Sequence, residues 1–189
     1  MDTPRLSTLE AIDAAVWQQL ARCVADRQHP WRTPVLATVD TDTDSGAPRA
    51  EARTVVLREV DAAERTLLVY TDARSAKARQ LRSHPQATLL MWSPALGWQL
   101  RCRVDLHIDE DGLAASSRWA RIRLSPAAQD YLSPLPPGSP LDTPALAGVD
   151  RAHFAVVTAR VHDIDWLELH ADGHRRASLS TAGHHWLQP

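Results

Sequence analysis

The strongest constraint on the fold is a strict alternation of apolar and polar residues over positions 97–108. The apolar members are Trp98, Leu100, Cys102, Val104, Leu106 and Ile108, and the polar members are Gln99, Arg101, Arg103, Asp105 and His107. Because successive side chains of a strand point to opposite faces, only a strand brings the apolar set together. A strand with one apolar and one polar face is typical of an antiparallel sheet covered on one side. The segment therefore predicts such a sheet.

Strand-like segments dominate the rest of the chain. The expected strands are residues 35–39, 53–58, 66–70, 87–92 and 154–164, with a return strand after the turn at 171–173 that ends near residue 180. The expected helices are residues 7–26, 72–83 and 109–124, with a second helical segment at 125–131. We expect a capping box over residues 7–10 and Asp72 as the cap of the second helix. Since turns join most strands, a mainly β (α+β) chain is favoured: an antiparallel barrel with peripheral helices.

Length and charge narrow the class of protein. The chain has 189 residues and a net charge of −2, with no block of like charge. We expect residues 1–189 to form one domain. A basic excess on one face, which nucleic-acid and membrane-surface binders need, is absent from the sequence, so we expect neither partner. No apolar run reaches the roughly 20 residues that span a bilayer, and the polar first ten residues are unlike a secretory signal. These features predict a cytoplasmic protein.

Common catalytic and metal-binding patterns are missing from the sequence. It contains no Gly-x-Ser-x-Gly elbow and no glycine-rich phosphate loop. Cys23 and Cys102 are far apart, and the nine histidines show no helical or cysteine-supported ligand spacing. We therefore expect no metal site.

One basic cluster is consistent with an anion site. Lys77 is the single lysine among 21 basic residues. It lies with Ser75 in the first turn of an expected helix, directly after a strand that ends at Thr71, and Arg53 begins an earlier strand. Free N–H groups at a helix N-terminus, together with hydroxyls and two cations, favour a phosphate. The alternative is a capped surface helix with solvated basic residues, and the spacing alone favours that alternative.

Five short segments in order resemble the FMN-binding pyridoxamine 5′-phosphate oxidase family. They are Arg-Thr-Val-Val-Leu-Arg at 53–58, Tyr-Thr at 70–71, Ser-Ala-Lys-Ala-Arg-Gln at 75–80, Gln99, and the C-terminal set Trp166, His174, Arg176, Trp186 and Pro189. The resemblance covers about residues 49–108 and 154–189. It implies a split β-barrel that forms a homodimer, with FMN bound in a groove between the subunits.

The resemblance also implies roles for individual residues. The expected FMN-binding residues are Arg53, Thr54, Val55, Val56, Leu57, Arg58, Tyr70, Thr71, Ser75, Lys77, Gln99, Trp166 and Arg176. Among them, Arg53, Lys77, Thr71 and Ser75 would hold the phosphate, and Gln99, Trp166 and Arg176 would lie near the isoalloxazine ring. The expected contacts to a small-molecule substrate are Arg58, Trp119, Arg123 and His174. The resemblance leaves the catalytic residues unassigned. For Arg101 and Arg103 an ordinary solvent-facing role is an equal alternative to a role at the dimer groove.

Several positions depart from the family's pattern. Asp172 stands where the family has an arginine over the substrate ring, and Ala127 replaces a serine. Ala76 replaces an arginine for the FMN phosphate, although Arg74 is near in sequence. We therefore expect an FMN-dependent oxidoreductase that transfers a hydride from a small substrate to flavin, with weak turnover of pyridoxamine phosphate. The alternatives are a non-catalytic protein that stores or senses FMN, and a structural barrel without a cofactor.

Overall fold

The structure is a computed structural model that describes residues 5–41, 45–125, 128, 131–141 and 153–189. Within these residues the strands are β1 (Val35–Thr41), β2 (Pro48–Thr54), β3 (Leu57–Asp61), β4 (Thr66–Asp72), β5 (Gln86–Ser93), β6 (Trp98–Asp109), β7 (Phe154–Glu168), β8 (Arg175–Ser180) and β9 (Gly183–Leu187). The helices are α1 (Leu9–Ala25), α2 (Ala76–Ser83) and α3 (Leu113–Ile122), with the short 3-10 helix η1 (Pro30–Arg32). No helix in these ranges combines the length and the apolar character that a membrane crossing requires.

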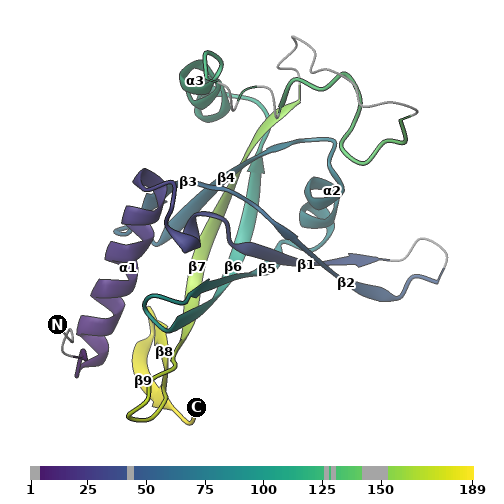
Figure 1. Cartoon of the computed structure of the whole chain (residues 1–189). Coiled ribbons are helices and arrows are strands. Elements are labelled where there is room, and N and C mark those ends of the chain that lie inside the picture. The colour runs from purple at the N-terminus through teal and green to yellow at the C-terminus, as the bar shows by residue number, and fades with distance from the viewer. Residues whose placement is uncertain (1–4, 42–44, 126–127, 129–130, 142–152) are drawn as a thin grey trace.

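The strands form one antiparallel sheet in the order β2-β1-β5-β6-β7-β4-β3 (Figure 1). The long strand β7 pairs with β4 through its first half and with β8 through its second half, and β9 extends the sheet from β8. A bulge between Arg103 and Val104 interrupts the pairing of β6 with β7. Bulges bend a strand and increase its twist. The sheet therefore curls without closing, which confirms the predicted mainly β, split-barrel architecture.

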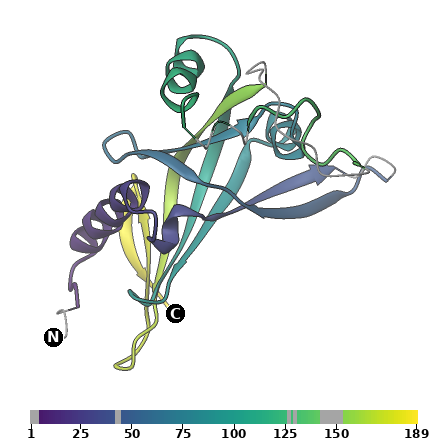
Figure 2. The ribbon, with the colours of Figure 1, turned by 45° about the horizontal axis from the view of Figure 1, so that its top comes forward.

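The main core lies on the concave side of this sheet. The alternation of β6 is confirmed, because Trp98, Leu100, Cys102, Val104 and Leu106 are buried. Helix α1 buries Ile12, Val16 and Leu20, which share one helical face, and packs against β3, β8 and β9. Figure 2 shows α1 along one side of the sheet and α3 at the far end. A smaller apolar cluster, which includes Trp119, Tyr131 and Phe154, packs α3 against β7.

Several expected boundaries are wrong. Residues 53–58 are not one strand: β2 ends at Thr54, Val55 donates its N–H to the carbonyl of Pro34 at 2.9 Å, and β3 starts at Leu57. The β-branched run has high strand propensity, but a propensity cannot show where a chain leaves one edge of the sheet for the other. Strand β7 also continues through residue 168, and β9 was not predicted.

The helix caps also differ from the expected ones. Thr8 caps α1 through its hydroxyl, and Ser75 caps α2, accepting from the N–H of Ala78 at 3.3 Å. The Asp72 carboxylate instead accepts a hydrogen bond from the N–H of Arg74 and pairs with the guanidinium of Arg74. Asp72 precedes the first helical residue, Ala76, by four positions and does not cap the helix. Helix α3 begins at Leu113 rather than residue 109. Most of the expected segment 125–131 and residues 42–44 lie outside the described residues.

Candidate functional site

Two cations from separate elements face one groove. Arg53 comes from the edge strand β2, and Lys77 comes from the first turn of α2. The groove between them has a volume of about 380 Å³. Its lining comprises Asp40, Glu51, Ala52, Arg53, Ser75, Ala76, Lys77, Gln80, Pro137 and Gly138. The structure therefore brings together Arg53, Lys77 and Ser75, three of the four expected phosphate ligands.

The fourth expected ligand, Thr71, lies in contact with Lys77. The Nζ of Lys77 donates to Thr71 Oγ1 at 2.8 Å, and Thr71 Oγ1 lies 3.2 Å from Ser75 Oγ. Both hydroxyl side chains are buried: Thr71 is the last residue but one of β4, and Ser75 caps the helix that follows. The local sequence thus folds a strand end, a capping serine and a lysine into one polar cluster.

Arg53 is held by neutral acceptors. Its Nη1 donates to the carbonyl of Leu36 at 3.3 Å and to the hydroxyl of Thr38, and its Nη2 donates to Gln80 Oε1 at 2.8 Å. Each contact fixes the guanidinium without cancelling its charge. Gln80 is 3% exposed, and it was not among the expected site residues although it ends the 75–80 segment. The signal that could have identified it is a polar residue on the buried face of an otherwise exposed short helix.

The electrostatics of the two cations suit an anion. Burial lowers the pKa of Lys77, the positive charge of Arg53 lowers it further, and Asp72 partly opposes both effects. Burial also lowers the pKa of Arg53, against the opposing charges of Glu51 and Asp40. Within the described part of the chain, neither cation has a carboxylate oxygen within 4.0 Å. Two partly buried cations that lack a direct ion pair and lie beside two hydroxyls fit a phosphate monoester, which carries about two negative charges and three acceptor oxygens.

Arg74 does not replace the family's phosphate-binding arginine, whose position is occupied here by Ala76. Its guanidinium pairs with Asp72 at 2.7 Å and donates to the carbonyls of Ser133, Pro134 and Leu135 at 2.8–3.3 Å. The side chain thereby holds the segment that leads to Pro137 and Gly138 at the groove. Arg74 contributes to the wall of the groove rather than to its cationic lining.

The residues expected near the flavin ring lie elsewhere. Residues that pair directly on neighbouring strands lie on the same face of a sheet. Arg53 pairs with Leu36, Leu36 with Leu89, and Leu89 with Cys102, so Arg53 lies on the face that forms the core. Gln99 lies on the opposite face, in one row with Leu167 and Arg176. Arg176 is paired there with Asp165 through contacts of 2.9 and 2.7 Å. One chain therefore does not bring the ring-side candidates to the phosphate-side candidates.

Trp166 is fully buried and does not face a ligand site in this chain. Its ring packs edge-on against Trp98, with centroids 5.4 Å apart, and against Trp186 at 6.5 Å. In the 53–58 segment, Val55 and Leu57 point into the core, so those two positions offer a ligand only their backbone. Thr54 is exposed, and Val56 is half-buried.

The expected substrate contacts are also dispersed. Arg58 donates to the hydroxyl of Tyr131 at 3.2 Å, and its guanidinium lies 5.9 Å from the ring centroid of Tyr70. Tyr70 in turn donates to Glu59 Oε1 at 2.7 Å. Trp119 is 8% exposed. Arg123 follows α3, whereas His174 is exposed in the turn between β7 and β8 at the other end of the molecule (Figure 1).

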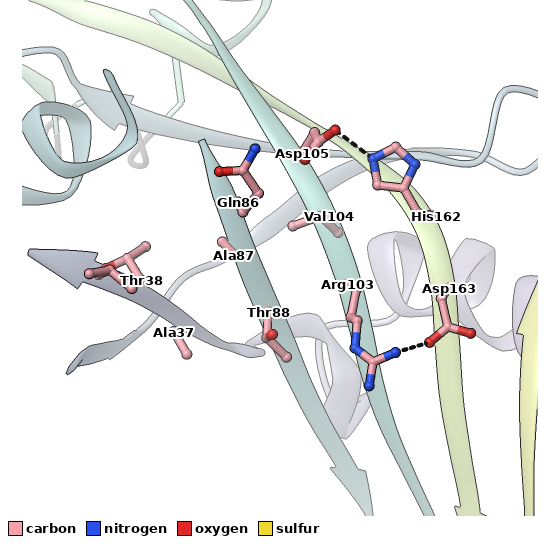
Figure 3. Close-up of a pocket in the computed structure, with 11 residues that line it drawn as sticks. Ala37, Thr38, Gln86, Ala87, Thr88, Arg103, Val104, Asp105, His162 and Asp163 are labelled. Atoms are coloured by element: carbon pink, nitrogen blue, oxygen red, sulfur yellow. Dashed lines mark hydrogen bonds and ion pairs between the residues drawn. The ribbon is translucent and has the colours of Figure 1, made fainter. Parts of the chain in front are cut away.

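A second groove of about 510 Å³ lies on the face of the sheet opposite the core, which we call the outer face (Figure 3). Figure 3 shows that its charged side chains are paired with each other. Arg103 Nη1 lies 2.9 Å from Asp163 Oδ2, and His162 Nε2 lies 2.7 Å from Asp105 Oδ2. Because the arginine is already paired and two carboxylates line this groove, it is a poorer phosphate site than the groove of Arg53 and Lys77.

This chain is similar to known proteins. Relatives named pyridoxine/pyridoxamine 5′-phosphate oxidase occur in Azorhizobium caulinodans, 39% identical over 90 residues, and in Caulobacter vibrioides, 33% identical over 106 residues. These alignments cover 48% and 54% of this chain but only 39% and 46% of the relatives. The chain thus spans less than half the length of these curated relatives.

Solved structures match over nearly the whole chain. A pyridoxamine 5′-phosphate oxidase-related, FMN-binding protein from Nostoc punctiforme is 25% identical, with a TM-score of 0.71 and coverage of 93% of this chain and 96% of that one. PhzG from Burkholderia lata shares the fold at 19% identity, with a TM-score of 0.72 and full coverage of both chains. The family model described as pyridoxamine 5′-phosphate oxidase, FMN-binding domain, matches residues 14–109, just over half of the chain. The chain therefore belongs to the FMN-binding pyridoxamine 5′-phosphate oxidase family, and its cofactor is FMN.

Proposed function

We propose that this protein is an FMN-dependent oxidoreductase whose FMN phosphate binds between Arg53 and Lys77. The observation that carries the proposal is the pair of partly buried cations, which have two buried hydroxyls beside them and no carboxylate within 4.0 Å among the described residues. Arg53 and Lys77 would make charge-assisted hydrogen bonds to the phosphate, and Thr71 and Ser75 would complete its shell. Bound FMN would supply the redox chemistry by accepting a hydride from a small substrate.

We also propose that the protein is a homodimer in which the second copy completes the flavin site. The ring-side candidates Gln99 and Arg176 lie on the outer face of the sheet, away from Arg53 and Lys77. The same face exposes Val39, Leu90 and Trp92, which are 36%, 37% and 42% exposed. Burial of these side chains against a second copy would favour association. Light scattering should therefore give twice the chain mass of 20.9 kDa, and a single-chain mass would contradict the proposal.

A non-catalytic FMN-binding protein is the second candidate. It is favoured by Asp172, which is 82% exposed in the turn where the family carries an arginine over the substrate. A carboxylate repels a substrate phosphate and cannot stack a positive charge on a ring. Trp119, one of the expected substrate contacts, instead packs against Phe154 with ring centroids 5.4 Å apart.

Two measurements test the proposal. Fluorescence titration with FMN and riboflavin, which lacks the phosphate, should show a clear preference for FMN that Arg53→Ala and Lys77→Ala both reduce. Equal affinities of the wild type and both variants would exclude the phosphate site. The FMN-loaded protein is then mixed with candidate amine and alcohol substrates without oxygen. Loss of the flavin absorbance near 450 nm indicates an oxidoreductase, and an unchanged spectrum with every substrate supports the non-catalytic candidate.

A further inference from the structure

Gln80 connects Arg53 to the second half of strand β1. Its Oε1 accepts hydrogen bonds from Arg53 Nη2 at 2.8 Å and from Thr38 Oγ1 at 2.7 Å. Its Nε2 donates to Asp40 Oδ2 at 3.0 Å. Gln80 is 3% exposed and Thr38 is 4% exposed, so the bond between them is buried, while the bonds to Arg53 and Asp40 are partly buried. The amide oxygen accepts two hydrogen bonds and the NH₂ group donates one, which ties the amide to three neighbours.

The partners fix which way the amide points. A guanidinium only donates, so it requires the oxygen of Gln80, and a carboxylate only accepts, so it requires the NH₂ group. If the amide were reversed, its NH₂ group would face the N–H groups of Arg53, and its oxygen would face the carboxylate of Asp40. Asp40 therefore sets the orientation that presents an acceptor to Arg53.

The chemistry of this position bears on the charge of Arg53. A carboxylate at position 80 would accept the same hydrogen bond but would form an ion pair with the guanidinium. The neutral amide holds the guanidinium in place and leaves its positive charge available to the groove. Thr38 and the carbonyl of Leu36, the other acceptors for Arg53, are neutral too.

We propose that Gln80 is a positioning residue that orients Arg53 toward the FMN phosphate while leaving its guanidinium free of a direct ion pair. This rests on the proposed function, in which Arg53 binds the phosphate. Gln80 contributes to selection of the phosphorylated flavin through Arg53, because a correctly held but neutralised arginine would not distinguish FMN from riboflavin.

The test compares the ratio of FMN to riboflavin affinity in matched variants. Gln80→Glu keeps the size of the side chain and adds one negative charge, so FMN affinity should fall by about tenfold or more while riboflavin affinity changes less than about twofold. Gln80→Leu removes the acceptor without adding charge and should lower the ratio by a smaller factor. Gln28→Glu adds the same charge at an exposed position beyond α1 and should leave the ratio unchanged.

A double-mutant cycle with Arg53→Ala separates positioning from packing. If Gln80 acts through Arg53, Gln80→Glu should lower the ratio little further in the Arg53→Ala background. The positioning role is wrong if Arg53→Ala lowers the ratio and Gln80→Glu does not, or if Gln80→Glu lowers both affinities equally. An unchanged ratio in Arg53→Ala would instead refute the phosphate site itself. Gln80→Glu also places a carboxylate against that of Asp40, so its folding is checked by circular dichroism. Should it fail to fold, Gln80→Leu still tests the positioning role, and an unchanged ratio in that variant would refute it.

Discussion

Replacement of Lys77 by methionine should separate FMN affinity from stability, because the two change in opposite directions. Methionine keeps the length of an unbranched side chain but removes the ammonium. Lys77 Nζ has one hydrogen-bond acceptor in the described structure, Thr71 Oγ1 at 2.8 Å. A hydrogen bond from a charged donor to phosphate contributes about 1.5–3 kcal/mol, so FMN should bind roughly 10- to 150-fold more weakly to Lys77→Met.

The apoprotein should not be destabilised by this change. Burial and the neighbouring Arg53 lower the pKa of Lys77 below its ordinary value of 10.5, so folding disfavours the charged form. Between the lowered pKa and 10.5 the unfolded chain binds more protons than the folded chain, and the free energy of unfolding rises with pH. Below that window the cost of the buried ammonium is fully present. Lys77→Met removes this cost together with that part of the pH dependence.

The assay pairs FMN titration with thermal unfolding of the FMN-free protein. We expect Lys77→Met to melt at or above the temperature of the wild type at neutral pH, with FMN affinity reduced. Lys77→Arg is the matched control, because it keeps the positive charge and should lose less affinity than Lys77→Met. A variant that binds FMN as tightly as the wild type would refute the phosphate contact. A variant whose apoprotein melts well below the wild type would refute the argument that the buried ammonium is a cost.

Three further changes have expected outcomes. Glu168→Gln should lower the free energy of unfolding by about 3 kcal/mol in urea titration, because Glu168 is 5% exposed and accepts hydrogen bonds from Arg5 and Arg175. Burial raises the pKa of Glu168, but hydrogen bonds from the arginines lower it more. The stabilisation by Glu168 should therefore be lost as the pH falls through this lowered pKa. Trp166→Ala should lower the free energy of unfolding by about 3–5 kcal/mol in the same titration, since this ring is fully buried. An unaltered urea titration would contradict the buried placement. Asp172→Arg should raise the weak turnover of pyridoxamine phosphate that we expect of the wild type, measured as pyridoxal phosphate formed, and robust wild-type turnover would refute the role given to Asp172.

Much of the fold was predictable because its strands carry local signals. The alternation over β6 identified the buried face of the central strand, and short apolar runs located β1, β4 and β5. The break between Thr54 and Leu57 was not predictable, since both halves have the composition of a strand. What decides the break is that β2 and β3 pair with different partners, β1 and β4, at the two ends of the sheet. That is a property of the tertiary arrangement rather than of the local sequence.

The sequence predicted the cations of the proposed phosphate groove but not the residues that support them. Ser75 and Lys77 belong to one helix turn, so their proximity follows from local structure, whereas Arg53 was a second cation at the start of an expected strand, to which the family resemblance then gave the same role. Gln80 was overlooked because its role depends on Thr38 and Asp40, which are about 40 positions away in sequence. Long-range hydrogen bonds of this kind leave no periodic pattern in a single sequence.

The separation of the two halves of the flavin site has a thermodynamic consequence under the proposed dimer. Arg53 and Lys77 open on one side of the sheet, whereas Gln99 and Arg176 lie on the other, so one FMN would contact both groups only by bridging two chains. A ligand that binds the dimer more tightly than the single chain stabilises the dimer by the same free energy with which dimerisation strengthens its own binding. FMN affinity should therefore depend on protein concentration, and Lys77→Met should weaken the FMN-induced part of the association while leaving dimerisation of the FMN-free protein unchanged. The phosphate site then has a second effect: by holding one end of FMN on one chain, it presents the ring to the face of the partner, and assembly and cofactor loading become a single equilibrium.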